Sequence, residues 1–377
     1  MRKCNKDNKP IRILHVLGST NHGGAQSFIM NIFRNVNRSN VQFDFVVHTP
    51  DQCHFDAEIM SLGGSVYRCP KYKGKNHFTY LAWWSNFFNE HPHYHIVHGH
   101  VRSTASIYLK VANNFNIITI SHSHSTTSGS GFQGLIKRIL QFPIRYTADY
   151  LFACSTIAGN WLFGNKACKT GDFYIINNSI EAEKFIFNES VRMLIRKELQ
   201  IEDKFVIGHV GRFDEQKNHY GLIEIFKEVH DQKFNSVLLL VGNGKLKSQI
   251  EEKVNKLGLK DSVIFTGARS DVSELMQAMD IFVFPSLREG LGIVVIEAAA
   301  SGLHCIVSDS IPKEAYVTSQ IESVPLKDNA FIWAGKILNY SDGYERVNAL
   351  ENIKEHNYNV QDTANWIENF YLEVVDK

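Results

Sequence analysis

Short apolar runs rich in β-branched residues recur along the 377-residue chain, and stretches with helical spacing of apolar residues separate them. The runs are continuous rather than alternating, which is typical of strands buried on both faces of a parallel sheet. They are IRILHVLG, FDFVVHT, HIVHGH, NIITISHSH, YLFACS and FYIIN in the first half, and KFVIGHVGR, SVLLLVGNG, SVIFTGA, DIFVFPS and HCIVSDS in the second. The sequence therefore predicts an α/β protein with two doubly wound, Rossmann-like domains that face each other across a cleft.

A polar and acidic segment at about 178 to 192 interrupts this rhythm before a new helical stretch begins. The length agrees with two domains, since one domain usually takes roughly 100–200 residues. We predict an N-terminal domain over 1–182 and a C-terminal domain over 190–360. The last stretch, about 361–377, predicts an amphipathic helix that packs back on the N-terminal domain, with its apolar side formed by Trp366, Ile367, Phe370, Tyr371 and Val374.

The composition is that of an ordinary globular protein, with 44% hydrophobic and 21% charged residues. The longest early apolar stretch is far too short for a signal sequence or for a membrane span of about 20 residues, so we expect a cytoplasmic protein. The six cysteines are scattered and form no Cys-x-x-Cys pair, which indicates free thiols in a reducing compartment.

The net charge of +1 hides an unequal distribution of charge along the chain. Residues 1–190 hold 19 Lys and Arg against 11 Asp and Glu, or +8, whereas residues 191–377 hold 21 against 28, or −7. A basic domain attracts anionic surfaces, because each exposed cation near a charged membrane contributes about 1 kcal/mol. Opposite charges can equally help two domains of one chain associate, so both interpretations stay open.

The loop after the strand FVIGHV carries two cations five residues apart, Arg212 and Lys217, ahead of a helix. Arginine offers a planar fork for phosphate oxygens and lysine a compact point charge, while Gly211 lets the backbone come close to a ligand. This pattern indicates a loop that binds a diphosphate. A surface loop with ordinary solvated charges is the alternative.

The segment after the strand DIFVFP places Glu289 before a glycine-spaced turn of Gly290, Leu291 and Gly292, and a helix is expected to begin near that turn. The first N–H groups of a helix have no internal partners, so an anion or a sugar hydroxyl can bind there. Glu297 stands in the apolar run of this helix, where a carboxylate is costly without a partner. A carboxylate accepts well from vicinal hydroxyls, so the two glutamates predict two sets of sugar contacts. A solvated helix face for Glu297 is the alternative.

A glycine pair, Gly23 and Gly24, follows the first strand and comes directly before a helix. This turn predicts a second helix start lined by backbone amides. The spacing G-x-G-x-x-G of a dinucleotide fingerprint is absent, which argues against a dehydrogenase.

A His-x-His pattern includes the pairs His93/His95, His98/His100 and His122/His124. Residues two apart in a strand share a face, so each pair offers two metal ligands. No third ligand stands at a recognisable spacing from any pair, and the chain has no Asp-x-Asp for a magnesium-bound diphosphate, so we predict no metal site. The last pair ends a strand and is therefore expected to contact substrate.

Two stretches mix basic and aromatic residues, an arrangement compatible with contact to a membrane surface. The first has three lysines, at Lys71, Lys73 and Lys75, beside a helical pattern that predicts burial against the sheet for Phe78, Leu81, Trp84 and Phe88. The second, GLIKRILQFPIRY, leaves membrane contact and burial equally open for the segment around Lys137, Arg138 and Arg145.

The segments GRFDEQKN and FTGARSDVSELMQAMDIFVFPSLREGLGIVVIEAAASG, taken with the early glycine pair, resemble the retaining glycosyltransferases of family 4, which have the GT-B fold. The resemblance is specific over residues 206–310 and looser across the rest of the chain. The stretches HGGAQ, SHSHST and GRFDEQKN are most similar to bacterial capsular and exopolysaccharide enzymes.

The resemblance implies roles for four charged residues. Arg212 and Lys217 would hold the donor diphosphate and neutralise the leaving group, as a metal does in other enzymes. Glu289 would contact the transferred sugar, with the amides of the glycine-spaced turn nearby, and Glu297 would bind the ribose hydroxyls.

Further residues are implied by the same resemblance. The backbone at Ala268 and Arg269 would read the nucleobase, which suggests a uridine donor. The early glycine pair would approach the diphosphate or the acceptor. His124 resembles the family's strand-end histidine near the sugar, and His122 is the competing assignment.

The resemblance thus implies transfer of a hexose or N-acetylhexosamine from a UDP-sugar, with retention, to a glycan acceptor. Acceptors in such enzymes are often linked to undecaprenyl diphosphate, which suggests work at the inner face of the plasma membrane, without cofactor, metal or nucleic acid. One departure concerns the interdomain Asn-Gly, which is Asn178-Ser179 here, since serine tolerates positive φ poorly. The alternatives are a nucleotide-sugar epimerase or hydrolase on the same fold, and a non-catalytic protein that binds a nucleotide-sugar and supports another transferase.

Overall fold

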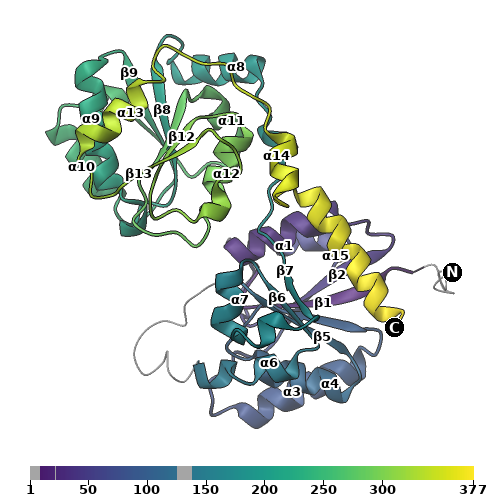
Figure 1. The fold of residues 1–377 in the computed structure, drawn as a ribbon. Helices are drawn as coiled ribbons and strands as arrows, with labels where there is room; N and C mark the ends of the chain where they lie inside the picture. The colour runs from purple at the N-terminus through teal and green to yellow at the C-terminus, as the bar shows by residue number, and fades with distance from the viewer. Residues whose placement is uncertain (1–8, 22, 125–137) are drawn as a thin grey trace. The chain divides into compact units, whose positions relative to one another are not determined.

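The computed structural model describes residues 9–21, 23–124 and 138–377, and it divides the chain into two compact units. The first unit comprises Met1–Ser179 together with Val360–Lys377, and the second comprises Ile180–Asn359. Figure 1 shows the C-terminal helix in yellow among the purple and teal elements of the first unit. Both ends of the chain therefore belong to the same unit.

The first unit is built on a parallel sheet in the order β3-β2-β1-β4-β5-β6-β7. Its strands are β1 (Ile11–Leu17), β2 (Val41–Val47), β3 (Val66–Arg68), β4 (Ile96–Gly99), β5 (Ile118–Ser123), β6 (Tyr150–Ala153) and β7 (Phe173–Ile175). Its helices are α1 (Gly24–Asn35), α2 (Asp56–Ser61), α3 (His77–Glu90), α4 (Ala105–Asn114), α6 (Ile144–Thr147), α7 (Thr156–Phe163), η1 (Ala167–Lys169) and α15 (Val360–Val375). One face of the sheet packs against α1 and α15, and the other against α3, α4 and α7.

The second unit repeats this plan with a parallel sheet in the order β10-β9-β8-β11-β12-β13. Its strands are β8 (Phe205–Val210), β9 (Ser236–Val241), β10 (Val263–Gly267), β11 (Ile281–Phe284), β12 (Cys305–Ser308) and β13 (Ile321–Val324). Its helices are η2 (Ala182–Phe185), α8 (Glu189–Leu199), η3 (Glu215–Lys217), α9 (His219–Gln232), α10 (Lys247–Lys256), η4 (Lys260–Ser262), α11 (Val272–Ala278), α12 (Ile293–Ala300), η5 (Lys313–Ala315), α13 (Ala330–Leu338) and α14 (Leu350–Glu355). One face packs against α8, α11 and α12, and the other against α9, α10 and α13.

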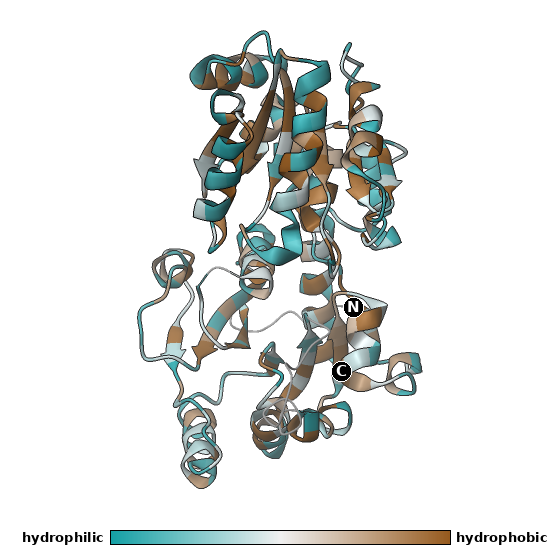
Figure 2. Cartoon of the chain, turned by 90° about the vertical axis from the view of Figure 1, so that its left-hand side faces the viewer, coloured by the Kyte–Doolittle hydropathy of each residue, from teal (hydrophilic) through white to brown (hydrophobic). Residues whose placement is uncertain are grey.

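Helices cover both faces of each sheet. Strands that are apolar along their length are stable there, because neither face of the sheet meets water. Every residue of β2 and of β9 is buried, so neither strand has a face exposed to water. Figure 2 shows the strands mainly in the brown of apolar residues, while the outer helices mix brown with teal. Two Rossmann-like parallel sheets, of seven and six strands within the described residues, confirm the predicted fold class.

The burial predicted for helix α3 is partly wrong. Trp84 and Phe88 are 0% and 1% exposed, but Phe78 is 83% exposed. The buried side of the helix runs through Tyr80, Trp84 and Phe87, at spacings of four and three residues, and Phe78 in the first turn lies away from it. Lys137, in the second basic and aromatic stretch, falls outside the described residues.

Helix α15 completes the core of the first unit. Ala364, Ile367, Tyr371 and Val374 are buried in the same apolar cluster as α1 and β2, whereas Trp366 remains 39% exposed. No helix within the described part of the chain combines the length and apolar character needed to cross a membrane.

Candidate functional site

Two loops of the second unit meet at the carboxyl ends of neighbouring strands. Strands β8 and β11 pair directly, so the loops that follow them leave the sheet side by side. The backbone N–H of Leu287 donates to the carbonyl of Gln216 at 2.8 Å, and the amide of Asn218 donates to the carbonyl of Pro285 at 3.0 Å. These bonds fix the loops to each other at the edge where parallel sheets commonly bind ligands.

Lys217 and Glu289 form an ion pair at this junction. The Nζ of Lys217 lies 2.7 Å from Oε1 of Glu289, and the side chains are 18% and 8% exposed. The hydroxyl of Ser286 donates to the same carboxylate oxygen at 2.7 Å, and the Lys217 ammonium lies 4.6 Å from the centroid of the Phe284 ring. The sequence predicted separate ligands for these two charges, whereas the structure brings them into direct contact.

Arg212 stands on the same loop but in a different environment. Its side chain is exposed, and among the described residues it makes no ion pair. Its guanidinium is therefore available to an anion near the Lys217 ammonium. The neighbouring Gly211 packs against the loop after β9, where a Cβ on Gly242 would lie 2.0 Å from the Gly211 carbonyl oxygen. Gly242 was not predicted from the sequence as part of this region, although the GNG that follows the strand SVLLLV indicates a turn there.

Helix α12 begins where the glycine-spaced turn ends. Gly292 adopts φ +84°, a left-handed conformation that favours glycine, and no side chain caps the helix start. Gly290 and Leu291 precede it in the same turn. Amide groups at such an uncapped start are suited to bind an anion or a hydroxyl group.

Glu297 lies one turn into α12 and is half-buried. No hydrogen-bond or ion-pair partner for its side chain is present among the described residues. Burial raises the pKa of this carboxyl to about 7, because the protein removes water from the charged form without replacing it. A carboxylate held in this way is ready to accept hydrogen bonds from a ligand.

Ala268 and Arg269 follow β10, which is two strands from β8 in the sheet. Ala268 is exposed. The Nε of Arg269 donates to Asp271 at 2.8 Å, and Nη2 lies 3.5 Å from Glu198. Asp271 raises the pKa of the Arg269 guanidinium above its ordinary value. The arginine side chain is thus occupied within its own unit, so only the backbone of this segment is free to recognise a base.

The glycine pair and the strand-end histidine belong to the first unit. Gly24 opens α1, and Gly23 precedes it with extended backbone and no side-chain cap on the helix. His124 follows β5 and is half-buried, whereas His122 within β5 is 0% exposed. Of the two competing histidines, only His124 has a surface open to a ligand.

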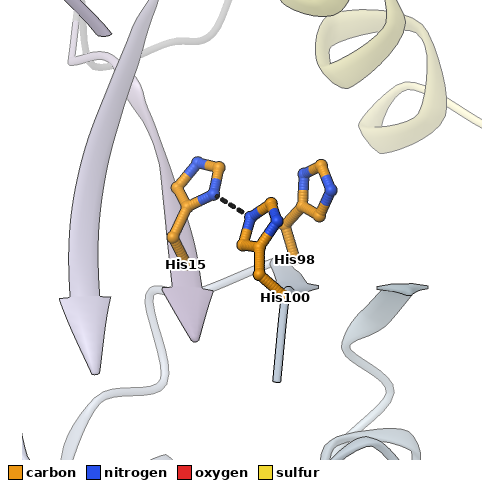
Figure 3. A group of neighbouring side chains, drawn as sticks. All are labelled: His15, His98 and His100. Atoms are coloured by element: carbon orange, nitrogen blue, oxygen red, sulfur yellow. Dashed lines mark hydrogen bonds between the residues drawn. The ribbon is translucent and has the colours of Figure 1, made fainter. Parts of the chain in front are cut away.

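Histidines from three neighbouring strands gather in the first unit, and this corrects the sequence analysis. Partners for the His-x-His pairs come from adjacent strands rather than from nearby sequence. Two groups of three have ligand atoms within 4.8 Å of one another: His15, His98 and His100, drawn in Figure 3, and His100, His122 and His124. Sequence spacing does not reveal this grouping, because His15 and His100 lie 85 positions apart.

A hollow of about 1000 Å³ in the second unit lies at the opposite, amino ends of the strands. Its lining includes Arg192, Arg196 and Asp280, which form ion pairs of 2.5 and 3.1 Å. The carboxylate of Asp280 also accepts from the backbone N–H of Val206 at 2.7 Å. These contacts tie α8 to the sheet, so we assign the hollow a structural role.

Comparison with known proteins places this fold and site in a family. A family model described as glycosyl transferases group 1 matches residues 191–339, which include both loops and α12. The chain is 34% identical over 335 residues to the putative glycosyltransferase EpsF of Bacillus subtilis, with 86% of each chain covered. It is 26% identical over 247 residues, 63% of each chain, to an Escherichia coli enzyme named UDP-Gal:alpha-D-GlcNAc-diphosphoundecaprenol alpha-1,3-galactosyltransferase.

Solved structures share the fold at low sequence identity. The complex of Anabaena Alr3699/HepE with UDP and glucose has a TM-score of 0.71 at 16% identity, covering 97% of this chain and 99% of that one. A glycosyltransferase from Rickettsia africae has a TM-score of 0.76 at 16% identity, covering 98% and 99%. Because the similarity to the Bacillus relative extends over 86% of both chains, this protein belongs to the group 1 glycosyltransferases and has their two-domain GT-B fold.

Proposed function

We propose that the protein is a retaining glycosyltransferase of family 4 that moves a hexose or N-acetylhexosamine from a UDP-sugar to a glycan acceptor in cell-surface polysaccharide synthesis. The observation that carries the proposal is the Lys217–Glu289 pair, 2.7 Å apart beside the uncapped start of α12. A cation and a carboxylate in contact suit a donor whose diphosphate and sugar hydroxyls are neighbours. Arg212, exposed on the same loop, supplies a second cation.

The proposed reaction uses these charges at the leaving group. The bond from the anomeric carbon to the diphosphate oxygen breaks, and the bond to the acceptor oxygen forms on the same face. UDP leaves, and its diphosphate takes the proton of the acceptor hydroxyl. Arg212 and Lys217 stabilise the negative charge on the diphosphate, so the proposal needs no metal there.

The proposal assigns the remaining contacts to the donor to residues around α12 and after β10. Glu289 accepts from hydroxyls of the transferred sugar, and Glu297, half-buried without a partner, accepts from the ribose diol. The backbone at Ala268 and Arg269 contacts the uracil. The proposal also includes three residues of the first unit, for which the family resemblance implies contacts to the donor or the acceptor: Gly23, Gly24 and His124.

A lipid-linked acceptor is part of the proposal, and two surface patches of the first unit support it. One patch has exposed Phe78 beside three exposed lysines, Lys71, Lys73 and Lys75. The other has three exposed apolar residues near Arg138 and Arg145, namely Ile139, Phe142 and Tyr146, which are 64%, 56% and 76% exposed. Apolar and basic side chains together suit an anionic membrane surface, which agrees with the diphosphoundecaprenol in the name of the Escherichia coli relative.

The test begins with the donor. A panel of nucleotide-sugars is screened for thermal stabilisation, because a ligand at about 100 times its dissociation constant adds roughly 2.7 kcal/mol to the free energy of unfolding. Turnover is then measured with the stabilising donor and a diphosphate-linked N-acetylglucosamine acceptor, with and without added Mg²⁺ or Mn²⁺. Nuclear magnetic resonance of the product reports the anomeric configuration.

Variants separate the proposed site from general charge effects. Lys217→Met and Glu289→Gln are each expected to lower kcat by about 10²-fold or more. Lys245→Met is the matched control, because Lys245 forms an exposed pair with Glu215 at 4.0 Å and is expected to leave kcat unchanged. Near wild-type turnover in both site variants would contradict the mechanism, and rapid release of free sugar without acceptor would indicate a hydrolase instead.

A further inference from the structure

Five histidines form one buried cluster in the first unit. They come from the carboxyl-end halves of three adjacent strands, β1, β4 and β5, and from the residues that directly follow β4 and β5: His15, His98, His100, His122 and His124. The first four are between 0% and 8% exposed, and His124 is half-buried. A parallel sheet aligns these strand ends, which brings together rings that lie far apart in sequence.

The rings contact one another through their nitrogens. His100 is the centre, with Nε2 3.1 Å from Nδ1 of His15 and Nδ1 2.9 Å from Nε2 of His124. Figure 3 shows the first of these contacts. Nε2 of His98 lies 3.2 Å from Nδ1 of His122. The hydroxyl of Tyr371, from α15, lies 2.6 Å from Nδ1 of His98.

Three ring nitrogens of the cluster have no partner within the described structure. They are Nε2 of His15, Nε2 of His122 and Nδ1 of His124. A change of tautomer moves the proton from one ring nitrogen to the other, but it does not supply a hydrogen-bond partner for these three atoms. A buried polar atom left unsatisfied costs about 1–3 kcal/mol, so the cluster is incomplete as a hydrogen-bond network.

Burial disfavours the charged form of each of the five imidazoles. It lowers the pKa of His15 and of His124 to about 3, and it lowers the pKa of His98, His100 and His122 well below the ordinary value.

Of the two groups of three, only one offers access to an ion. In the group of His15, His98 and His100, all three members are buried. In the group of His100, His122 and His124, two members have an unpartnered nitrogen, and the half-buried His124 gives a way in.

We propose that His100, His122 and His124 bind a divalent transition-metal ion of the Zn²⁺ type, with a fourth position open to water or another oxygen ligand. Nitrogen ligands at about 2.0–2.1 Å from zinc in tetrahedral geometry lie roughly 3.4 Å from each other. The ligand atoms of this group already lie within 4.8 Å of one another, and the closest printed pair is 2.9 Å apart. Zinc binding would therefore move these nitrogens from their present spacing to that of a tetrahedral site.

The ligand types decide the class of ion. Every member of the group is an imidazole, which suits Zn²⁺, Ni²⁺, Co²⁺ or Cu²⁺, whereas Mg²⁺ and Ca²⁺ prefer oxygen. His15 and His98 lie behind the ligands and orient their rings, as residues around a metal site commonly do. The site lies in the first unit and shares His124 with the donor contacts proposed above, whereas Arg212 and Lys217, proposed to hold the diphosphate, belong to the second unit.

The proposal is tested by measuring zinc binding to the full chain. The protein is prepared without a polyhistidine tag, and a chelator followed by dialysis removes bound metal. Titration calorimetry with ZnCl₂ and elemental analysis after gel filtration are expected to give one Zn²⁺ per chain. His124→Gln is expected to weaken zinc binding by tenfold or more. His95→Gln is the matched control, because His95 is exposed at the start of β4 outside the cluster, and it is expected to bind like wild type.

Additional readouts keep the result independent of folding defects. Circular dichroism of the metal-free variants must match wild type, and the half-buried His124 is chosen because its replacement disturbs the core least. The visible spectrum of the Co²⁺ form reports tetrahedral nitrogen ligation in wild type and in His95→Gln, and its loss is expected in His124→Gln. Failure to retain zinc, or equal affinity in wild type and His124→Gln, overturns the proposal.

Discussion

Glutamine in place of Glu297 is expected to stabilise the second unit in a pH-dependent way. Burial raises the pKa of this carboxyl from 4.5 to about 7 in the folded chain, a difference of 2.5. Between these two values the folded chain keeps a proton that the unfolded chain has released. The free energy of unfolding therefore falls as the pH rises through this range.

The size of the effect follows from the same shift. Each pKa unit corresponds to 1.36 kcal/mol, so ionised Glu297 lowers the free energy of unfolding by at most about 3 kcal/mol above pH 7. Glutamine has a similar shape but no charge to desolvate. Glu297→Gln is accordingly expected to be about 3 kcal/mol more stable than wild type at pH 8 and nearly equal to it at pH 4.

Urea unfolding at both pH values measures this difference. The readout is pulse-labelling hydrogen exchange of peptides from α12, which follows the second unit even if the two units unfold separately. The control is Glu274→Gln, since Glu274 is exposed on α11. If the stability difference of Glu297→Gln does not grow with pH beyond that of the control, the reasoning from burial is refuted.

Three further changes test the packing described above by urea unfolding. Gly242→Ala is expected to destabilise the second unit by about 3 kcal/mol, because the added Cβ would lie 2.0 Å from the Gly211 carbonyl oxygen and φ is +141°; a loss below 1 kcal/mol would contradict this. Tyr371→Phe removes the hydroxyl partner of buried His98 and is expected to cost the first unit about 1–3 kcal/mol, with no change in the second. Asp280→Asn leaves two arginines of α8 without their carboxylate and is expected to cost about 3 kcal/mol, and an unchanged midpoint would rule out a structural role for the pair.

The periodicity of the sequence was sufficient to predict the two sheets. Strands β2 and β9 are buried along their whole length, and apolar residues predominate in both. The short strands β3 and β13, of three and four residues, were not predicted. Their sequences, VYR and IESV, hold too few consecutive apolar residues to form a recognisable run.

The candidate site was harder to predict than the fold, because its contacts join residues far apart in sequence. The loop after one strand and the turn before α12 were both recognised as ligand-binding segments. The pairing of Lys217 with Glu289 spans 72 positions and depends on β8 lying beside β11. The contact of His15 with His100 likewise depends on β1 lying beside β4. Strand order in a sheet has no signature in local spacing, so neither contact could be predicted.

The return of the chain to its starting unit has a consequence during synthesis. Residues of α15 fill one face of the first sheet, yet they leave the ribosome after the whole of the second unit. The middle segment, Ile180–Asn359, holds its own sheet and core and is fully emerged before them. The first unit can therefore complete its core only after the second unit has emerged, and a nascent chain stalled before residue 360 would leave that core open to chaperones.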